Sequence, residues 1–123
     1  MSELARFLFQ KGHFSASVKR VKPAGFNPGN RPDLSVFDVR AADEQVRRAL
    51  GAEVAALQNR AVKARAEIML SALDDLPLSF ERDDVPLFRH GNILGFPVGD
   101  DEENRSARLE LATALASRAT LCI

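Results

Sequence analysis

The 123-residue chain has no tryptophan and no tyrosine, so phenylalanine supplies every aromatic ring of the benzene type. Phenolic acid–base chemistry is therefore excluded, and stacking on a nucleic-acid base has only Phe or His to draw on. The single cysteine, Cys122, forms no internal disulfide and supplies no cysteine metal site. A domain of this length buries a sufficient core without such staples.

Several further patterns are absent. No apolar run approaches the roughly 20 residues that a membrane helix needs, and the N-terminus lacks the apolar core of a signal peptide. We therefore expect a cytoplasmic protein without membrane contact. GxSxG, GxGxxG and GxxxxGK[ST] loops are missing, which argues against a serine-hydrolase elbow and a standard nucleotide-binding loop. No HxxxH, HxH or HxxE spacing occurs, so we expect no metal and no cofactor.

Charge is balanced in total but uneven along the chain. Seventeen basic and seventeen acidic residues give a net charge of zero, which argues against a general polyanion binder. Residues 11–32 nevertheless carry five basic residues and no acid, whereas 74–84 and 100–103 are acidic. Two interpretations follow: the stretches neutralise each other or are simply solvated, or the basic stretch forms a local site for phosphate or carboxylate.

The length favours a single globular domain over residues 1–123. Short apolar or alternating runs at 5–9, 14–18, 34–39, 65–71, 78–81 and 93–98 predict strands, and the Pro- and Gly-rich segment 23–32 predicts a loop. An apolar stripe over 43–59 predicts a helix, which Gly51 interrupts. Acids at 100–103 followed by an apolar face predict a second helix. We expect an α+β fold, with a largely antiparallel sheet and two main helices packed on one side.

Only two histidines are present, and each lies in a polar, turn-like context immediately before an apolar segment. His13 precedes Phe14, and His90 lies shortly before Ile93. Either imidazole is able to act as an acid or base near neutral pH, or to make a structural hydrogen bond on a loop. Together they are the candidate catalytic residues.

Candidate ligand-binding residues surround these histidines. If residues 14–20 form a strand, Ser15 and Lys19 lie on one face, which would present hydroxyl groups and positive charge to an anion. The full candidate set for ligand binding is Ser15, Lys19, Arg20, Lys22, Arg31, Ser35, Arg89 and Asn92. A solvated strand face beside a loop is the alternative interpretation.

Four segments resemble a family of small uncharacterised bacterial proteins. They are His13-Phe14-Ser15, residues 21–26 (VKPAGF), residues 34–37 (LSVF) and residues 89–97 (RHGNILGFP). The resemblance covers most of the chain and carries no transferable function. It implies that the four segments belong together, and so it favours one site that joins His13, Lys22, Ser35, His90 and Asn92.

Three functions fit these observations. The first is a bacterial accessory domain that binds a partner protein, self-associates or recognises a phosphate-bearing ligand through its N-terminal basic segment. The second is a metal-independent, RNase-like enzyme that acts on a phosphodiester or nucleotide, with His13 and His90 as base and acid. The third, a component of a toxin–antitoxin or phage-defence system, concerns genomic context. The sequence alone does not decide among them.

Overall fold

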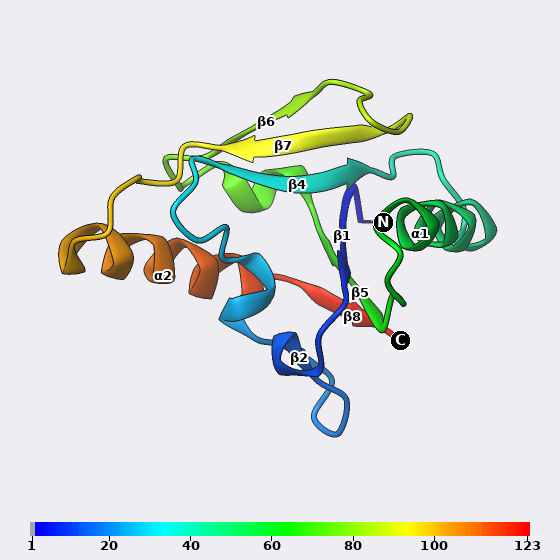
Figure 1. The fold of residues 1–123 in the computed structure, drawn as a ribbon, viewed down its shortest axis with the longest axis horizontal. Helices are drawn as coiled ribbons and strands as arrows, with labels where there is room; N and C mark the ends of the chain where they lie inside the picture. Colours follow the sequence, from blue (N-terminus) through cyan, green and yellow to red (C-terminus); the bar gives the residue numbers. More distant parts are fainter. Residues whose placement is uncertain (1) are drawn as a thin grey trace.

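The computed structural model describes residues 2–123 and contains two sheets and two main helices (Figure 1). All pairings are antiparallel, and the larger sheet has the order β6-β7-β4-β1-β5-β8. Its elements are β1 (Leu4–Leu8), β4 (Asp33–Asp38), α1 (Glu44–Gln58), β5 (Ala64–Ile68), β6 (Ser79–Arg82), β7 (His90–Leu94), α2 (Glu102–Ser117) and β8 (Thr120–Cys122). Strands β2 (Phe14–Ser15) and β3 (Arg20–Val21) form a separate hairpin, and 3-10 turns lie at η1 (Lys11–His13), η2 (Pro23–Phe26) and η3 (Leu70–Leu73). Over residues 2–123, none of the helices has both the length and the apolar character needed to cross a membrane.

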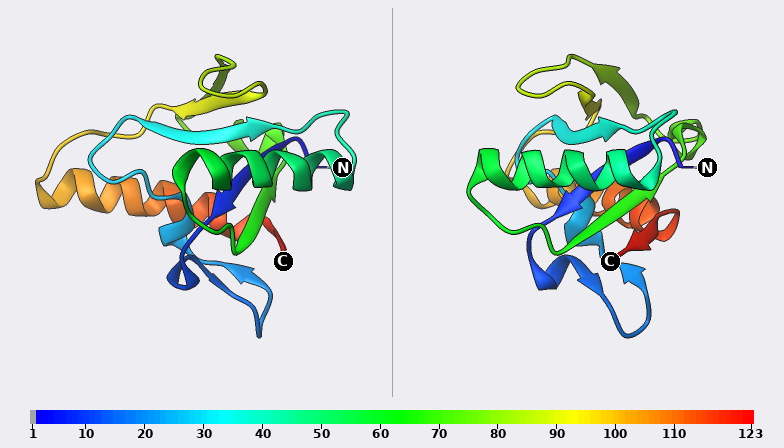
Figure 2. Two further views of the ribbon diagram at one scale, coloured as in Figure 1. Left: turned by 45° about the vertical axis from the view of Figure 1, so that its right-hand side comes forward. Right: turned by 90° about the vertical axis from the view of Figure 1, so that its right-hand side faces the viewer.

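The expected α+β class, with an antiparallel sheet and two main helices, is confirmed, but the helices lie on opposite faces of the sheet (Figure 2). Central strand β1 explains the difference, because both of its faces are apolar. Leu4 and Leu8 belong to the core that contains Leu111 and Leu115 of α2. Ala5 and Phe7, which point the other way, belong to a second core with α1. A sheet with two apolar faces needs a cover on each side.

Helix α1 forms where the apolar stripe predicts it, with Asp43 as its N-cap and Asn59 as its left-handed C-cap. Gly51 does not end the helix. A Cβ at this position would lie 3.1 Å from the Phe7 ring, so the glycine lets the helix pack closely against β1.

Two short segments differ from the sequence-based expectation. Alternation of Phe14, Ala16 and Val18 predicts one half-buried strand, but only residues 14–15 are extended and Val18 is exposed in the hairpin turn. Part of the expected loop at 23–32 is the ordered turn η2, because the Phe26 side chain is fully buried in the α2 core. This packing fixes η2 beside the sheet.

The sheet opens between β1 and β4. These strands pair only at Leu4–Asp38 and Ala5–Phe37, whereas β4 pairs with β7 over five residues and β1 with β5 over five. Beyond Ala5, strand β1 turns sharply away from β4 (Figure 1). The gap between the two halves of the sheet is the setting of the candidate site.

Buried ion pairs join α1 to β5. Glu67 accepts from Arg47 at 2.9 Å and from Arg65 at 2.6 Å, and all three side chains are less than 10% exposed. Arg65 also pairs at 2.6 Å with Glu44, whose side chain is 55% exposed. Glu67 is therefore the carboxylate that compensates two buried guanidinium groups.

We expect Glu67→Gln to lower the free energy of unfolding by about 3 kcal/mol, because it leaves buried positive charge without its partner. Urea denaturation followed by circular dichroism measures this change. Glu44→Gln removes the same charge at the exposed end of the network and serves as the matched control, with an expected loss below about 1 kcal/mol. Equal and small losses for both variants would contradict the role given to Glu67.

Candidate active site in the gap of the sheet

Arg6 fills the gap between β1 and β4. Its Nε donates to the backbone carbonyl of Gly25 at 2.6 Å, and its Nη1 donates to the carbonyl of Ser35 at 2.8 Å. No carboxylate forms an ion pair with Arg6 within residues 2–123, and no described residue accepts a hydrogen bond from Nη2. Burial lowers the pKa of Arg6 to about 10, so the group is still cationic at neutral pH. The half-buried guanidinium has no carboxylate partner among the described residues, and it is therefore suited to an external anion.

Ser35, His90 and Asp83 are hydrogen-bonded in series beside Arg6. Ser35 Oγ lies 2.7 Å from His90 Nε2, and His90 Nδ1 lies 2.7 Å from Asp83 Oδ1. The His90 ring is buried edge-on against Phe37, with ring centroids 5.3 Å apart, while Ser35 is exposed. The ionised carboxylate of Asp83 only accepts, so His90 Nδ1 carries a hydrogen. In the tautomer with its single hydrogen on Nδ1, Nε2 accepts from the Ser35 hydroxyl. This is the order of groups in a Ser-His-Asp triad.

Strand register brings these groups together. Ser35 pairs with Asn92, and Phe37 pairs with His90, so alternate residues of β4 and β7 share one face. Asn92 Nδ2 also donates to Asp83 Oδ2 at 3.2 Å, which fixes the second carboxylate oxygen. The hydrogen bond from His90 is the largest cause that lowers the pKa of Asp83, and Asp83 is accordingly ionised at neutral pH.

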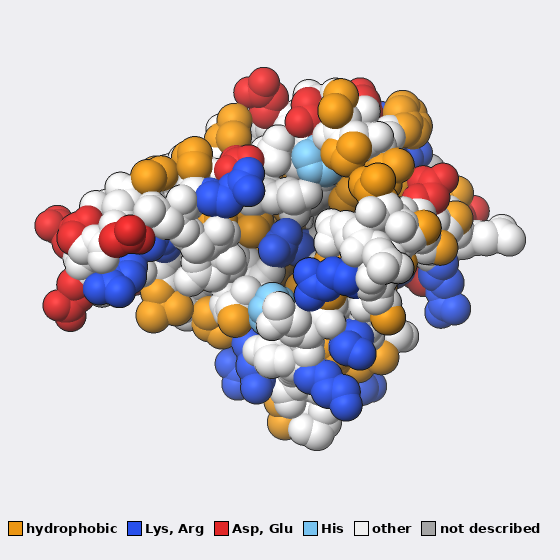
Figure 3. Space-filling model, in the orientation of Figure 1, with side chains coloured by type: hydrophobic (Ala, Val, Ile, Leu, Met, Phe, Trp, Pro, Cys, Tyr) orange, Lys and Arg blue, Asp and Glu red, His pale blue; other side chains and the backbone are white. Residues whose placement is uncertain are grey.

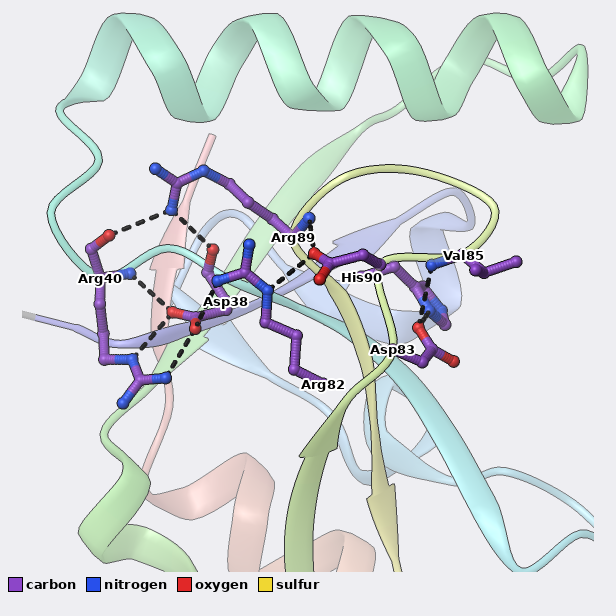
Figure 4. A network of polar contacts seen from close by, with 8 residues as sticks. Asp38, Arg40, Arg82, Asp83, Val85, Arg89 and His90 are labelled. Atoms are coloured by element: carbon purple, nitrogen blue, oxygen red, sulfur yellow. Dashed lines mark hydrogen bonds and ion pairs between the residues drawn. The ribbon is translucent and has the colours of Figure 1, made fainter.

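The loop from β6 to β7 holds Asp83 in place (Figure 4). The backbone amides of Asp83 and Asp84 both donate to the His90 carbonyl at 3.0 Å, and Val85 N donates to Asp83 Oδ1 at 3.1 Å. Asp84 accepts from Arg82 Nε at 2.7 Å and from the Arg89 amide at 2.9 Å. The carboxylate of the triad thus belongs to a braced turn.

Two adjoining hollows form one groove along this face. One, of about 420 Å³, is lined by Arg6, Ser35, His90, Asp83, Asn92 and Arg31, among others. The other, of about 340 Å³, is lined by Arg6, Ser35, Phe9, His13, Gln58 and Arg60, among others. Because they share Arg6 and Ser35, these two residues lie at the centre of the groove. Figure 3 shows both histidines on this face, with blue side chains of Lys or Arg in the hollow between them.

His13 lies in the second hollow, at the end away from His90. Partial burial, with the nearby charges of Arg6 and Arg60, lowers the pKa of His13 below its ordinary value. The imidazole is therefore neutral at neutral pH. Neither of these two hollows is lined by both histidines, although the two share Arg6 and Ser35.

The structure gathers part of the sequence-derived set of candidates. Hydrogen bonds connect Ser35 to His90 and Asn92 to Asp83, so these candidates belong to one network. Arg31 lines one hollow of the groove and His13 lines the other. Arg31 is paired with Asp33 at 3.1 Å, so part of its charge is already compensated.

The other candidates lie elsewhere. Ser15, Arg20 and Lys22 line a separate hollow of about 330 Å³ at the hairpin, and Lys19 is exposed in the hairpin turn. Arg89 extends away from the triad and donates to the carbonyl groups of Asp38 and Arg40 (Figure 4).

Sequence reasoning missed Arg6 and Asp83. Arg6 lies within the apolar run Leu4–Leu8. A charged residue among apolar neighbours was the signal that could have marked it as a functional residue. In the sequence, Asp83 stands out only as one of the acidic residues of 74–84. Asp83 reaches His90, seven residues later, only because the chain turns back from β6 to β7. No sequence motif predicts this contact.

Metal chemistry is not indicated by the side chains: within residues 2–123, no group of three or more His, Cys, Asp or Glu residues is arranged to hold a metal ion. Another hollow, of about 390 Å³, lies between α1 and β5, and its buried charges Arg47 and Arg65 are paired with Glu67. Its two buried guanidinium groups are therefore compensated within the protein, unlike that of Arg6.

Comparison with protein-family models, with curated proteins and with solved structures gives no match to this chain. The function is therefore argued from the geometry of the site itself.

Asp38, at the end of β4, makes the stability of the fold depend on pH. Its side chain is 2% exposed, and hydrogen bonds from Arg40, at 3.0 and 2.7 Å, are the main cause that lowers its pKa from 3.8 to about 2. A depressed carboxyl pKa stabilises the fold at pH values above 3.8, and this stabilisation is lost as the pH falls through about 2.

We expect Asp38→Asn to lower the free energy of unfolding by about 2 kcal/mol at pH 7, from the size of that shift. The difference from the natural chain should shrink as the pH falls from 4 towards 2, when Asp38 itself becomes protonated. Urea denaturation at a series of pH values measures both effects. Asp75→Asn, at a carboxylate that is 69% exposed, is the control with a loss below about 1 kcal/mol. A difference for Asp38→Asn that did not change with pH would contradict the linkage.

Proposed function

We propose that the protein is a small, metal-independent enzyme that cleaves phosphate esters, either phosphodiesters or nucleotides, with Ser35 as its nucleophile. The observation that carries this proposal is the hydrogen-bonded series Ser35–His90–Asp83 at the centre of a groove, beside the uncompensated guanidinium of Arg6. An exposed hydroxyl with a buried imidazole behind it and a carboxylate behind the imidazole is the arrangement that activates a serine.

The reaction has two steps. Ser35 Oγ attacks phosphorus while its proton passes to His90 Nε2, and the bond from phosphorus to the leaving oxygen breaks. His90 then gives this proton to the leaving alkoxide, which departs as an alcohol. In the second step a water attacks the phosphorus bound to Ser35 and one water proton passes to His90 Nε2. The bond from phosphorus to Ser35 Oγ breaks, His90 returns the proton to Ser35 Oγ, and the phosphate or phosphate monoester leaves. Asp83 stabilises the imidazolium in both steps.

Arg6 favours a phosphoryl group over an acyl group. Ser35 lies inside a strand that pairs with β7 on both sides of Asn92, so its neighbouring backbone amides are not arranged as an oxyanion hole at a turn. The charge beside the hydroxyl comes from a guanidinium instead. A guanidinium matches the several negatively charged oxygens of a phosphate and stabilises the charge that develops on them.

In this proposal His90 is the base that takes the proton from Ser35, whereas the sequence-based hypothesis has His13 as the base and His90 as the acid. His13, at the other end of the groove, would either donate a hydrogen bond to the bound substrate or accept one from it.

A second function is supported by one specific observation. Arg6 is able to bind an anion whether or not a reaction follows. A domain that only binds a phosphate-bearing ligand would therefore use the same groove. In that case the chain Ser35–His90–Asp83 would orient β4, β7 and the loop between β6 and β7. The two functions differ in whether Ser35 Oγ is required for turnover.

Hydrolysis of bis(4-nitrophenyl) phosphate in the presence of EDTA tests the enzyme. We expect release of nitrophenolate by the natural chain, and a loss of at least about 100-fold in kcat for both Ser35→Ala and Asp83→Asn. Ser15→Ala is the matched control, because Ser15 lies on the hairpin and hydrogen-bonds only to Ser17 among the described side chains. Its activity should equal that of the natural chain.

Two results would overturn the enzymatic proposal. Ser35→Ala with the kcat of the natural chain would exclude the nucleophile. Absence of turnover in the natural chain, together with phosphate binding by calorimetry that Arg6→Met abolishes and Ser35→Ala retains, would establish the binding function instead.

A further inference from the structure

A second feature of the molecule is the hairpin of β2 and β3, which we call the basic hairpin together with the flanking residues Lys11 and Lys22. It contributes no residue to the triad. Residues 4–32 contain six Lys or Arg residues and no acid. Lys11, Lys19, Arg20 and Lys22 are all exposed, and none forms an ion pair within residues 2–123. Positive charge that no carboxylate offsets creates a local field that attracts polyanions. The acids that balance the chain lie elsewhere, for example at the start of α2.

The hairpin joins the groove at His13. Lys22 N donates to the His13 carbonyl at 2.9 Å, and β2 starts at the residue after His13. The hairpin projects away from the sheet (Figure 1), and Figure 3 shows Lys and Arg side chains over this projection on the face that carries both histidines. A path of positive charge therefore runs from the hairpin into the groove and reaches Arg6.

The end of the groove near the hairpin also offers a stacking surface. The Arg60 guanidinium lies 4.7 Å from the centroid of the Phe9 ring, and both residues line the hollow that contains His13. Gln10 and Gln58 line the same hollow, and neither amide makes a hydrogen bond to another described side chain or backbone group. A planar ring system with polar edges is the ligand that such a wall accommodates, because bases stack on aromatic and guanidinium planes and hydrogen-bond through their edges.

We propose that the substrate is single-stranded nucleic acid, bound with its backbone along the basic hairpin and through the groove. One phosphate lies on Arg6 within reach of Ser35, and one base stacks at Arg60 and Phe9. The identity of the substrate deepens the proposed function and rests on it for the cleavage step, but the binding surface is tested on its own. A serine nucleophile has no need of a ribose 2′-hydroxyl, so RNA and DNA single strands are both substrates.

Fluorescence anisotropy with labelled 12-nucleotide strands of uridine or thymidine, in EDTA and over a series of salt concentrations, tests the surface. Ser35→Ala is used as the background so that the strand stays intact. We expect Arg20→Gln/Lys22→Gln to weaken binding about ten-fold near 0.1 M salt and to lower the slope of log K against log salt by about 1.4, the value for two lost phosphate contacts on a single strand. Arg48→Gln/Arg105→Gln removes the same charge from the two helices and should leave Kd and slope unchanged.

Phe9→Leu tests the stacking wall, because it keeps an apolar side chain and removes the ring. We expect about a five- to ten-fold weaker binding of the strand, the size of one lost base stack. Heparin of similar length has no bases, and its affinity should not respond to this variant. Equal effects on heparin and on the strand would overturn the nucleic-acid assignment, as would equal losses for the hairpin pair and the control pair.

The two proposals fail separately. Strand binding with the expected variant pattern, but without cleavage of either strand or of bis(4-nitrophenyl) phosphate, would support the nucleic-acid surface and overturn the nucleophile. Ser35-dependent hydrolysis of the nitrophenyl ester, without measurable affinity for either strand, would overturn the nucleic-acid surface and leave the enzyme in place.

Discussion

The placement of Arg6 is the constraint on which the site depends. Strands β1 and β4 separate after two paired residues, and the Arg6 guanidinium bridges the opening by donating to a carbonyl of η2 and a carbonyl of β4. Both acceptors are neutral, so these bonds hold the side chain without cancelling its charge. The opening of the sheet thereby becomes a groove with a fixed cation at its centre, and the buried Phe26 keeps η2 in position to accept.

Buried charge is handled differently in the two halves of the sheet. On β5, buried charges are compensated within the protein, since Glu67 accepts from both Arg47 and Arg65. On β4 and β7, the series of hydrogen bonds ends at the exposed hydroxyl of Ser35, and the Arg6 guanidinium on the neighbouring β1 has no carboxylate partner within residues 2–123. Folding alone does not require such an arrangement, because a neutral residue at position 6 would avoid the cost of desolvating a charge.

The sequence predicts most of the regular elements here because their signals are local. The stripe over 43–59 and the acids near 101 specify α1 and α2 through turns and caps, and β4 follows from its β-forming residues. The side of the sheet on which each helix lies is not local, since it depends on the two apolar faces of β1 being recognised together. The alternation at 14–18 wrongly predicts one strand, because period-2 spacing in an exposed hairpin turn has no buried face to specify.

The candidate site was predictable only in part for a related reason. Ser35, His90 and Asn92 were identified as polar residues beside or within strands, and pairing of β4 with β7 unites them. Asp83 joins them only through the turn that returns to β7. Arg6 joins them only because β1 and β4, two strands far apart in the sequence, pair and then diverge. The missing GxSxG motif argues against a serine-hydrolase elbow, but that motif describes only one way of presenting a hydroxyl. A serine at an opening in a sheet is exposed without a strained turn, so the absence of the motif excludes one fold and not the chemistry.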